Sequence, residues 1–370
     1  MIQTGFGHSS KSNVFSNFHP EHLSNTCLLK PLLPCITLSS FLVYLSLILL
    51  SGLTQASPPY YLLRSTLSPD HLQTQVELKN FLASRDVFLH SGFCGKNNNH
   101  ILVSSDTGQM ACIERYPRFQ QAIRGELYSY HFSQWLGTSN IPAIVVTRLR
   151  YAHDIWQPWK SKLTGMGWHE GDYLVVSHYY QNLSEVKLPE ILRTKKILSP
   201  RTRGHDSMSE MYQWSNLIIQ DYINGENDRL VNTLVNLEQN SSMYSHPVHN
   251  LGRSSDQRLI AYDNERSFGK GYDFALSKFD DVTGQKQQQY QPHVLYRLCL
   301  VSDSVREKLN DLSNQEDPAK TLEGYIQSVD FESFSLIAPL SKEHREVFNH
   351  RILHVLKHFS QCHRSPRINP

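Results

Sequence analysis

The stretch ENDRLVNTL, residues 226–234, decides which fold we predict for this chain. It places the acid Asp228 beside the base Arg229, and the amide of Asn232 follows about one helical turn later. Further along, the sequence AYDNE presents a second acidic centre, Asp263, after a short apolar run. The two motifs are either two halves of one metal and phosphate site or two polar surface turns.

The sequence on both sides of this stretch predicts two structural regions. Residues 87–116 hold short apolar runs broken by GFCG, NNN and DTG, a pattern typical of a small antiparallel sheet with tight turns. An amphipathic helix is predicted over 117–137, and a buried helix over 209–223 leads into ENDRLVNTL. This order is typical of a two-lobed α+β enzyme with a cleft between its lobes. We therefore predict a sheet-rich lobe over 87–180 and a helical lobe over 181–363.

Composition is that of a packed globular protein. The chain has 370 residues, of which 39% are hydrophobic and 19% are charged, so it can bury a sizeable core. Its 18 Tyr and 16 Phe also argue against a disordered chain. The net charge of +2 is too small to argue for nucleic acid or a membrane surface as the main partner.

A long apolar segment lies near the N-terminus. Residues 35–53, CITLSSFLVYLSLILLSGL, are mostly apolar, and a membrane-spanning helix needs about 20 such residues. Lys11 and Lys30 precede the segment, which favours a cytoplasmic N-terminus. The small residues TQA at 54–56 offer a site for signal peptidase, so a cleaved signal peptide is the alternative to an anchor. A buried core helix is the remaining reading.

We predict that this segment is a signal anchor over 31–56. It follows a short cytoplasmic or disordered N-terminus over 1–30 and precedes a stem and leading helix over 57–86, while residues 364–370 form a tail. The anchor predicts a single-pass type II protein whose folded domain lies in the secretory lumen. A cleaved signal peptide would send the same residues into the lumen.

Cysteines and sequons agree with a lumenal domain. Four of the six cysteines follow the apolar segment, and an even number in an oxidising compartment predicts two disulfides. The sequence leaves three pairings open, of which the local one joins neighbours along the chain; buried free thiols are the alternative. These cysteines are Cys94, Cys112, Cys299 and Cys362. Asn182 in NLS and Asn240 in NSS are glycosylation acceptors in that compartment.

Phosphoryl transfer needs few protein groups. One carboxylate orients the attacking hydroxyl, a second holds metal against the phosphates, a cation holds the phosphates, and an acid on a helix fixes that cation. The candidates for these four roles, in the same order, are Asp228, Asp263, Arg115 and Glu126.

Several motifs together resemble the Four-jointed family of secretory-pathway kinases, relatives of the Golgi kinases that phosphorylate secreted proteins. The resemblance rests first on QWSNLIIQDYINGENDRLVNTL and LIAYDNERSFGKGY. It extends from about Cys94 to Cys362 and includes FCG, MACIERY, IRGELYSYHFSQWLG and QNLSEV in the same order. The resemblance implies a two-lobed, atypical protein-kinase-like fold that binds ATP with Mg²⁺ or Mn²⁺ between its lobes.

The same resemblance implies a role for each polar residue. Asp228 matches the catalytic acid, Asp263 matches the metal-holding acid, and Glu126 matches the glutamate on the small-lobe helix. Asn232 would be the second metal ligand of the catalytic loop. Glu265 would be a further acid close to the metal.

The chain departs from the family pattern at two positions. The small-lobe cation is usually Lys, whereas ACIERY offers only Arg115 beside Glu114; Arg can still bind phosphate as a fork. A kinase catalytic loop carries Asn five residues after its Asp, but Thr233 stands there and the Asn is at 232. On a helix this shift turns the side chain by about 100 degrees.

Structural explanations without a catalytic or metal-binding role also exist for these residues. Asp228 and Arg229 could form a helix cap with a surface ion pair, and Asp263 with Asn264 could end a strand in a turn. The histidines of HVLKHFSQCH, residues 354–363, do not share one helix face with clean ligand spacing, so core or surface positions are favoured over a zinc site.

The sequence therefore predicts a Ser/Thr protein kinase of the Four-jointed type, held in the Golgi membrane or released from it. Its substrates would be extracellular domains, with cadherin repeats implied by the resemblance. Two alternatives stay open: a catalytically inactive pseudokinase that serves as a secreted ligand or scaffold, and a glycan kinase on the same scaffold.

Overall fold

The computed structural model describes residues 70–83, 87–90, 94, 98–117, 120–153, 155–194, 197–199, 208–239, 246–277 and 282–362. The predicted anchor over 31–56, the segment 1–30, the tail 364–370 and the sequon at Asn240 lie outside these residues. Within the described part of the chain, no helix is both long enough and apolar enough to cross a membrane.

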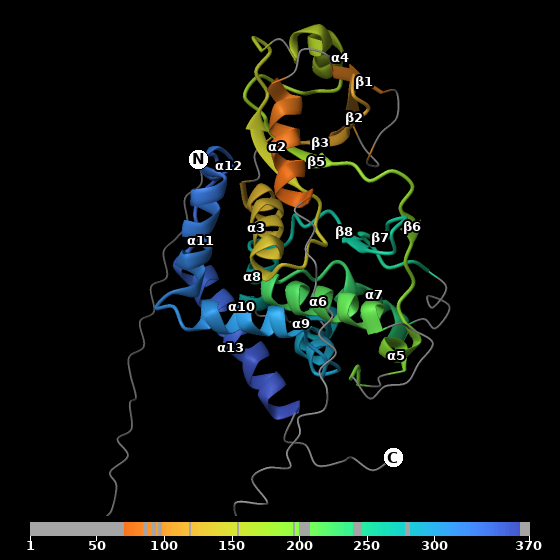
Figure 1. The fold of residues 1–370 in the computed structure, drawn as a ribbon, viewed down its shortest axis with the longest axis vertical. Helices are drawn as coiled ribbons and strands as arrows, with labels where there is room; N and C mark the ends of the chain where they lie inside the picture. Colours follow the sequence, from red (N-terminus) through yellow and green to blue (C-terminus); the bar gives the residue numbers. More distant parts are fainter. Residues whose placement is uncertain are drawn as a thin grey trace, which may run out of the picture. The chain divides into compact units, whose positions relative to one another are not determined.

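The N-terminal half of the described chain forms a five-stranded antiparallel sheet with strand order β1-β2-β3-β5-β4 (Figure 1). Its strands are β1 (Val87–Leu89), β2 (His100–Ser105), β3 (Met110–Tyr116), β4 (Ile144–Arg148) and β5 (Tyr173–His178). The sheet predicted from the short apolar runs is confirmed, and it gains two strands from the sequence that follows the predicted helix.

Two helices pack on this sheet. The helix α2 (Asp70–Ala83) contacts β4 and β5, and α3 (Gln120–Leu136) contacts β3 and β4. The predicted amphipathic helix is α3, although its burial extends almost all the way around. It ends at Gly137, whose φ of 72° permits the bonds from Gly137 to the Gln134 carbonyl and from Thr138 to the Ser133 carbonyl. This is the Schellman pattern, which closes the last turn of the helix.

The C-terminal half is mostly helical (Figure 1). The predicted helix before ENDRLVNTL is α6, which contacts α9 and α13. A small antiparallel sheet, β6-β7-β8, is also present. The elements after β4, apart from β5, are η1 (Gln157–Trp159), α4 (Lys160–Gly165), β6 (Ser184–Glu185), α5 (Glu190–Arg193), α6 (Met208–Asn224), α7 (Leu230–Gln239), β7 (Leu251–Arg253), β8 (Leu259–Ala261), α8 (Lys270–Leu276), α9 (Val282–Leu295), α10 (Asp303–Ser313), α11 (Pro318–Val329), α12 (Phe331–Phe334) and α13 (Lys342–Cys362).

The sheet part and the helical part share one hydrophobic core. An aromatic cluster connects them at α3, where the rings of Tyr128 and Phe268 lie 5.4 Å apart and those of Phe132 and Phe348 lie 5.5 Å apart. Phe268 follows the AYDNE motif closely, and its ring lies 5.6 Å from that of Phe348 on α13. The predicted α+β organisation, sheet-rich first and helical second, is confirmed.

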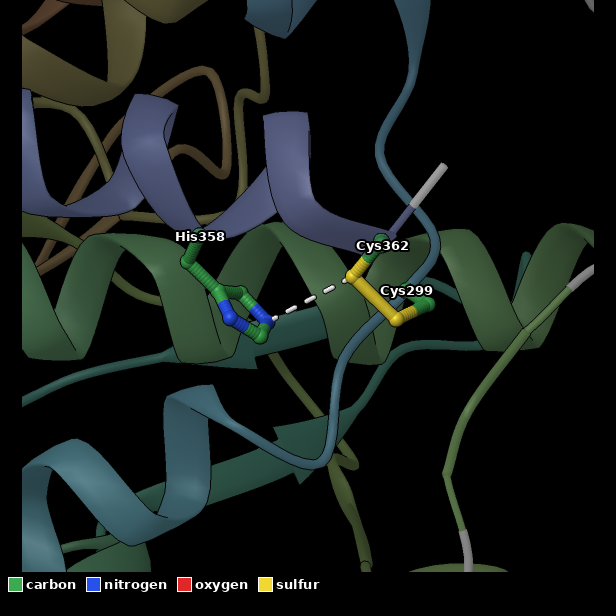
Figure 2. A group of neighbouring side chains, drawn as sticks. All are labelled: Cys299, His358 and Cys362. Atoms are coloured by element: carbon green, nitrogen blue, oxygen red, sulfur yellow. Dashed lines mark hydrogen bonds between the residues drawn. A yellow bond between two sulfur atoms is a disulfide. The ribbon is translucent and has the colours of Figure 1, made fainter. Parts of the chain in front are cut away.

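Two disulfides join the four cysteines in the local pairing. Cys94 bonds to Cys112 with 5.7 Å between Cα atoms, and Cys299 bonds to Cys362 with 5.5 Å. Figure 2 shows the imidazole of His358 beside the second bridge, with Nε2 3.7 Å from Cys362 Sγ. These three side chains are of metal-binding types and lie close together. Both sulfurs are consumed by the disulfide, however, and a metal needs thiolates.

Candidate active site

A cavity of about 500 Å³ lies between the five-stranded sheet and β8. Part of its lining is apolar and part is ionisable, and its volume falls in the range of small-molecule sites. The apolar lining residues are Pro142, Ile144, Val175, Leu183 and Ile260. The ionisable ones include His100, Glu114, Glu126, His178 and Asp263. The Cys94–Cys112 disulfide and the exposed Asn182 also line this space.

Asp263 follows β8, which ends two residues before it at Ala261, and its side chain lines the cavity. Its backbone is left-handed, with a φ of 55°, a conformation that Asp tolerates better than most residues. Although the side chain is exposed to the cavity, surrounding protein removes much of its water, and Glu114 and Glu265 add negative charge. These effects raise the pKa of Asp263 to about 6, against the opposing effect of Arg229.

Glu126 holds the segment that follows Asp263. It is buried on α3, where its carboxylate accepts a hydrogen bond from the backbone N–H of Asn264 at 2.5 Å and one from the Asn264 side chain at 3.4 Å. Burial raises the pKa of Glu126 well above its usual range, and the charges of Asp263 and Glu114 raise it further. The structure thus brings Glu126 and Asp263 to the same cavity. Glu126 binds Asn264, however, and not Arg115, the cation that it was predicted to fix; the partners of Arg115 are Gly167, Asn99 and Asp172.

Gly125 allows this contact. A Cβ atom at Gly125 would lie 2.5 Å from the Asn264 carbonyl oxygen and 2.9 Å from that of Glu265. No other residue type could be placed there without moving the backbone, because real Cβ contacts are longer. Gly125 therefore lets α3 approach the AYDNE segment closely enough for Glu126 to bind it. The sequence analysis did not single out this glycine.

Asp228 lies in the loop between α6 and α7. Its carboxylate accepts a hydrogen bond from the Asn232 side chain at 2.6 Å. The spacing of about one helical turn between the two residues brings them together. His249 Nδ1 lies 3.3 Å and Arg266 Nε lies 3.9 Å from its other oxygen. Asp228 is half-buried and does not line the cavity itself. The role of Asn232 as a metal ligand stays a prediction.

Arg229 joins the two motifs. It is 1% exposed and donates to Asp221 on α6, to the Tyr262 carbonyl at 3.2 Å and to the Asn264 side chain at 2.9 Å. The reading of Asp228 and Arg229 as a surface ion pair is therefore wrong, because Arg229 is buried and binds Asp221. Arg229, a residue of ENDRLVNTL, therefore binds Tyr262 and Asn264, the two neighbours of Asp263 in the sequence.

Glu226 provides a second connection between the motifs. This buried carboxylate accepts from the backbone N–H of Asp228 at 2.8 Å and from the Ser267 hydroxyl at 3.2 Å. Burial raises its pKa. Neither Glu226 nor the inward role of Arg229 was foreseen, since their partners lie in segments that come together only in the fold.

Arg115 is the predicted site residue that the structure does not bring to the others. Its guanidinium donates to the Gly167 carbonyl and to the Asn99 side chain at 3.1 Å, and it lies 3.5 Å from Asp172. None of these partners lines the cavity. Successive side chains of a strand point to opposite faces, and on β3 the residues that line the cavity are Cys112 and Glu114.

Glu265 lies at the edge of the site. Its carboxylate binds Lys270 Nζ at 3.1 Å, and it is not among the cavity-lining residues. Its charge nevertheless acts on Asp263 and on His100.

These features define a site in which carboxylates from three separate segments meet beside an apolar cavity. The family model of the Four-jointed box protein middle domain matches residues 73–365, so the chain belongs to this family. The predicted resemblance is confirmed.

Individual relatives are distant. The chain is 26% identical over 289 residues to Four-jointed box protein 1 of Mus musculus, covering 75% of this chain and 62% of the relative. It is 25% identical over 282 residues to the Drosophila melanogaster protein named extracellular serine/threonine protein kinase four-jointed, covering 61% of this chain and 46% of the relative. The chain thus spans about three fifths of the mouse relative and less than half of the fly one.

Solved structures with a similar chain path include the Golgi casein kinase, with a TM-score of 0.49 and 13% identity over 80% of this chain and 76% of that one. A second is hydra Fam20 with sugar, with a TM-score of 0.46 and 13% identity over 78% of this chain and 90% of that one.

Proposed function

We propose that this chain is a secretory-pathway Ser/Thr protein kinase that transfers the γ-phosphate of ATP to hydroxyl groups of extracellular domains. The observation that carries the proposal is the Arg229 network, which binds the loop of Asp228 to both neighbours of Asp263 at the edge of the cavity. Membership of the Four-jointed family and the name of the fly relative support it. Cadherin repeats are the substrates that we propose first.

The cavity suits a nucleotide with a divalent cation. Its apolar lining fits a purine base, and oxygen ligands are what Mg²⁺ and Mn²⁺ prefer. Burial, and after it the charges of Glu114 and Glu265, raise the pKa of Asp263, and a bound cation would offset the charge of these carboxylates. Asp263, with Asn232 and Glu265, would hold the cation. When bound, the cation neutralises charge on the phosphates.

In this proposal Asp228 acts on the acceptor hydroxyl. The hydroxyl oxygen bonds to the γ-phosphorus, its proton passes to Asp228, and ADP leaves. Asn232 fixes the orientation of the carboxylate through the bond at 2.6 Å, and half-burial leaves the group open to a substrate. Such positioning of a general base is worth about 10² to 10⁴ in rate.

We also propose that the domain lies in the Golgi lumen, anchored through residues 31–56 as a single-pass type II protein, with release as the alternative. Two disulfides support an oxidising compartment. Asn182 is exposed and so suits glycosylation.

A second candidate function is that of a pseudokinase. This function is favoured because the β3 side chain that lines the cavity beside Arg115 is the acid Glu114. Arg115 itself binds Asn99 outside the cavity. The described residues that line the cavity include no Lys or Arg.

A transfer assay on the full chain, purified from cultured cells, tests the proposal. The chain is incubated with labelled ATP, Mn²⁺ or Mg²⁺, and a panel of secreted domains that includes cadherin repeats. We expect Asp263→Ala to abolish both nucleotide binding and transfer, and Asp228→Asn to keep binding while losing about 10² or more in transfer. Asp256→Asn, an exposed acid outside the cavity, is the control and should behave as wild type.

The outcomes separate the candidates. Nucleotide binding without transfer to any domain of the panel would favour the pseudokinase. Equal transfer by the wild-type and Asp228→Asn proteins would remove Asp228 from the reaction.

A further inference from the structure

We infer that His100 binds the phosphate chain of the nucleotide and supplies the cation that Arg115, turned out of the cavity, does not. The inference rests on the proposed function, since it concerns the same cavity. It assigns the phosphate contact to β2, a strand in which the sequence analysis placed no site residue.

The position of His100 is the first support. It begins β2, and the register of the sheet pairs it directly with Glu114 of β3. Directly paired residues on adjacent antiparallel strands share a face, and both of these line the cavity. His100 Nε2 lies 3.2 Å from the Glu114 carboxylate, and the two side chains are only 19% and 24% exposed.

The charge balance of the cavity is the second support. Three of its described lining residues are carboxylates, namely Glu114, Glu126 and Asp263. A nucleotide adds the negative charge of its phosphates. A single divalent cation would not balance these groups, so positive charge from the protein is needed near the phosphates.

His100 can carry that charge. Burial lowers its pKa, but Glu114, Asp263 and Glu265 together more than offset this effect and raise the pKa above its usual value. The cavity contains a second histidine, His178, for which burial lowers the pKa. The pKa values of the two histidines are therefore shifted in opposite directions although they line the same space.

Glu114 then has a defined part in the site. A carboxylate in the inward β3 position would repel a phosphate, but paired with a protonated imidazole it holds the ring in place. The His100–Glu114 pair thus replaces the single lysine expected on the small lobe. A fork-shaped Arg is not needed there, which agrees with the engagement of Arg115 by Asn99 and Asp172.

The difference between the two histidines gives a matched experiment. Binding of ATP and of adenosine to the full purified chain is measured by calorimetry at fixed Mn²⁺. We expect His100→Gln to weaken ATP binding by about tenfold, the size of one charge-assisted hydrogen bond, and to leave adenosine binding unchanged. His100→Lys should restore ATP binding. His178→Gln should change the two affinities by the same factor.

Two results would overturn the inference. One is unchanged ATP affinity in His100→Gln while the wild-type chain binds ATP well, which leaves the proposed function standing. The other is an equal loss of ATP and adenosine binding in that variant, which would make His100 a purely structural residue. A wild-type chain that binds neither ligand would defeat the proposed function together with this inference.

Discussion

The two sides of the cavity are built in different ways. On the loop side, residues 225–229 and 262–265, buried residues hold the segments that carry the acids. Arg229 binds Tyr262 and Asn264, and Glu226 binds the backbone of Asp228 and the hydroxyl of Ser267, which follows AYDNE. On the sheet side, His100 and Glu114 with their neighbours on β2 and β3, the polar groups are paired across two strands and are partly exposed. The loop side is therefore cross-connected by buried polar groups, whereas the polar groups of the sheet side meet in a partly exposed imidazole–carboxylate contact.

This difference separates what phosphoryl transfer requires from what it tolerates. An acid that orients a hydroxyl and an acid that holds a cation must keep their relative positions, because small displacements cost large factors in rate. A positive charge near the phosphates can come from more than one residue type. In the proposed function, the loop side supplies the two acids of the expected pattern. The chain departs from that pattern at Arg115 on the sheet side and at Thr233, which stands where the pattern has Asn, in ENDRLVNTL.

Removing Arg229 is the strongest way to break the loop side. Arg229→Met leaves Asp221, which is 6% exposed, without its ionic partner. It also removes the hydrogen bonds to the Tyr262 carbonyl and the Asn264 side chain. Breaking one half of a buried ion pair costs about 3 to 5 kcal/mol, so we expect a loss of this size in the free energy of unfolding, measured with urea.

The matched control is Arg266→Met. Arg266 also approaches an acid of this region, at 3.9 Å from Asp228, but its side chain is 45% exposed. Exposed ion pairs contribute about 0 to 1 kcal/mol. Equal losses in the two variants would show that the Arg229 network does not hold the loop side.

Removing each disulfide in turn compares the sheet side with a region that does not line the cavity. Cys299 and Cys362 are 63 residues apart and Cys94 and Cys112 are 18 apart. Chain entropy then predicts losses of about 4 and about 3 kcal/mol when each pair is changed to Ser. Both losses would appear in urea unfolding of the purified chain.

Only the shorter bridge lines the cavity. We therefore expect the Cys94→Ser, Cys112→Ser double variant to weaken nucleotide binding, and the Cys299→Ser, Cys362→Ser variant to keep it under conditions where both remain folded. Equal weakening of binding would mean that the sheet side is not held locally by its bridge.

The sequence was informative where the signal is local. Apolar periodicity predicted α3 and α6, and the spacing of about one helical turn from Asp228 to Asn232 agrees with the hydrogen bond between them. The prediction of two disulfides is confirmed, and of the three pairings that the sequence left open the structure has the local one. The convergence of Asp263 and Glu126 followed from the family resemblance, not from periodicity.

The sequence was uninformative where a neighbour in space decides the outcome. Glu114 and Arg115 are adjacent on one strand, so one must face the cavity and the other must not; the choice depends on the register of the sheet. Arg229 looks like any charged residue after a turn, and only the fold places Asp221 and Asn264 around it. The sequence likewise gives no sign that the absence of a side chain at Gly125 allows the AYDNE segment to approach α3.

Gly125→Ala tests the contact that brings the two sides together. Replacing a glycine inside a helix by alanine usually stabilises a protein by about 0.5 to 1 kcal/mol. Here the new Cβ would lie 2.5 Å from the Asn264 carbonyl, so α3 and the AYDNE segment must separate. Overpacking of this kind costs about 1 to 3 kcal/mol, and we expect it to weaken Mn²⁺-dependent nucleotide binding because Glu126 no longer reaches Asn264.

Gly324→Ala in α11 is the matched substitution, because a Cβ atom there would meet nothing within 4 Å. It should raise the free energy of unfolding by the usual helical increment and leave nucleotide binding unchanged. If the free energy of unfolding falls in Gly125→Ala and rises in Gly324→Ala, the Gly125 contact is the cause, because helix propensity acts equally on both variants. Stabilisation of both proteins would mean that the AYDNE segment can move away from α3 freely, and that the positions of Glu126 and Asp263 are set independently.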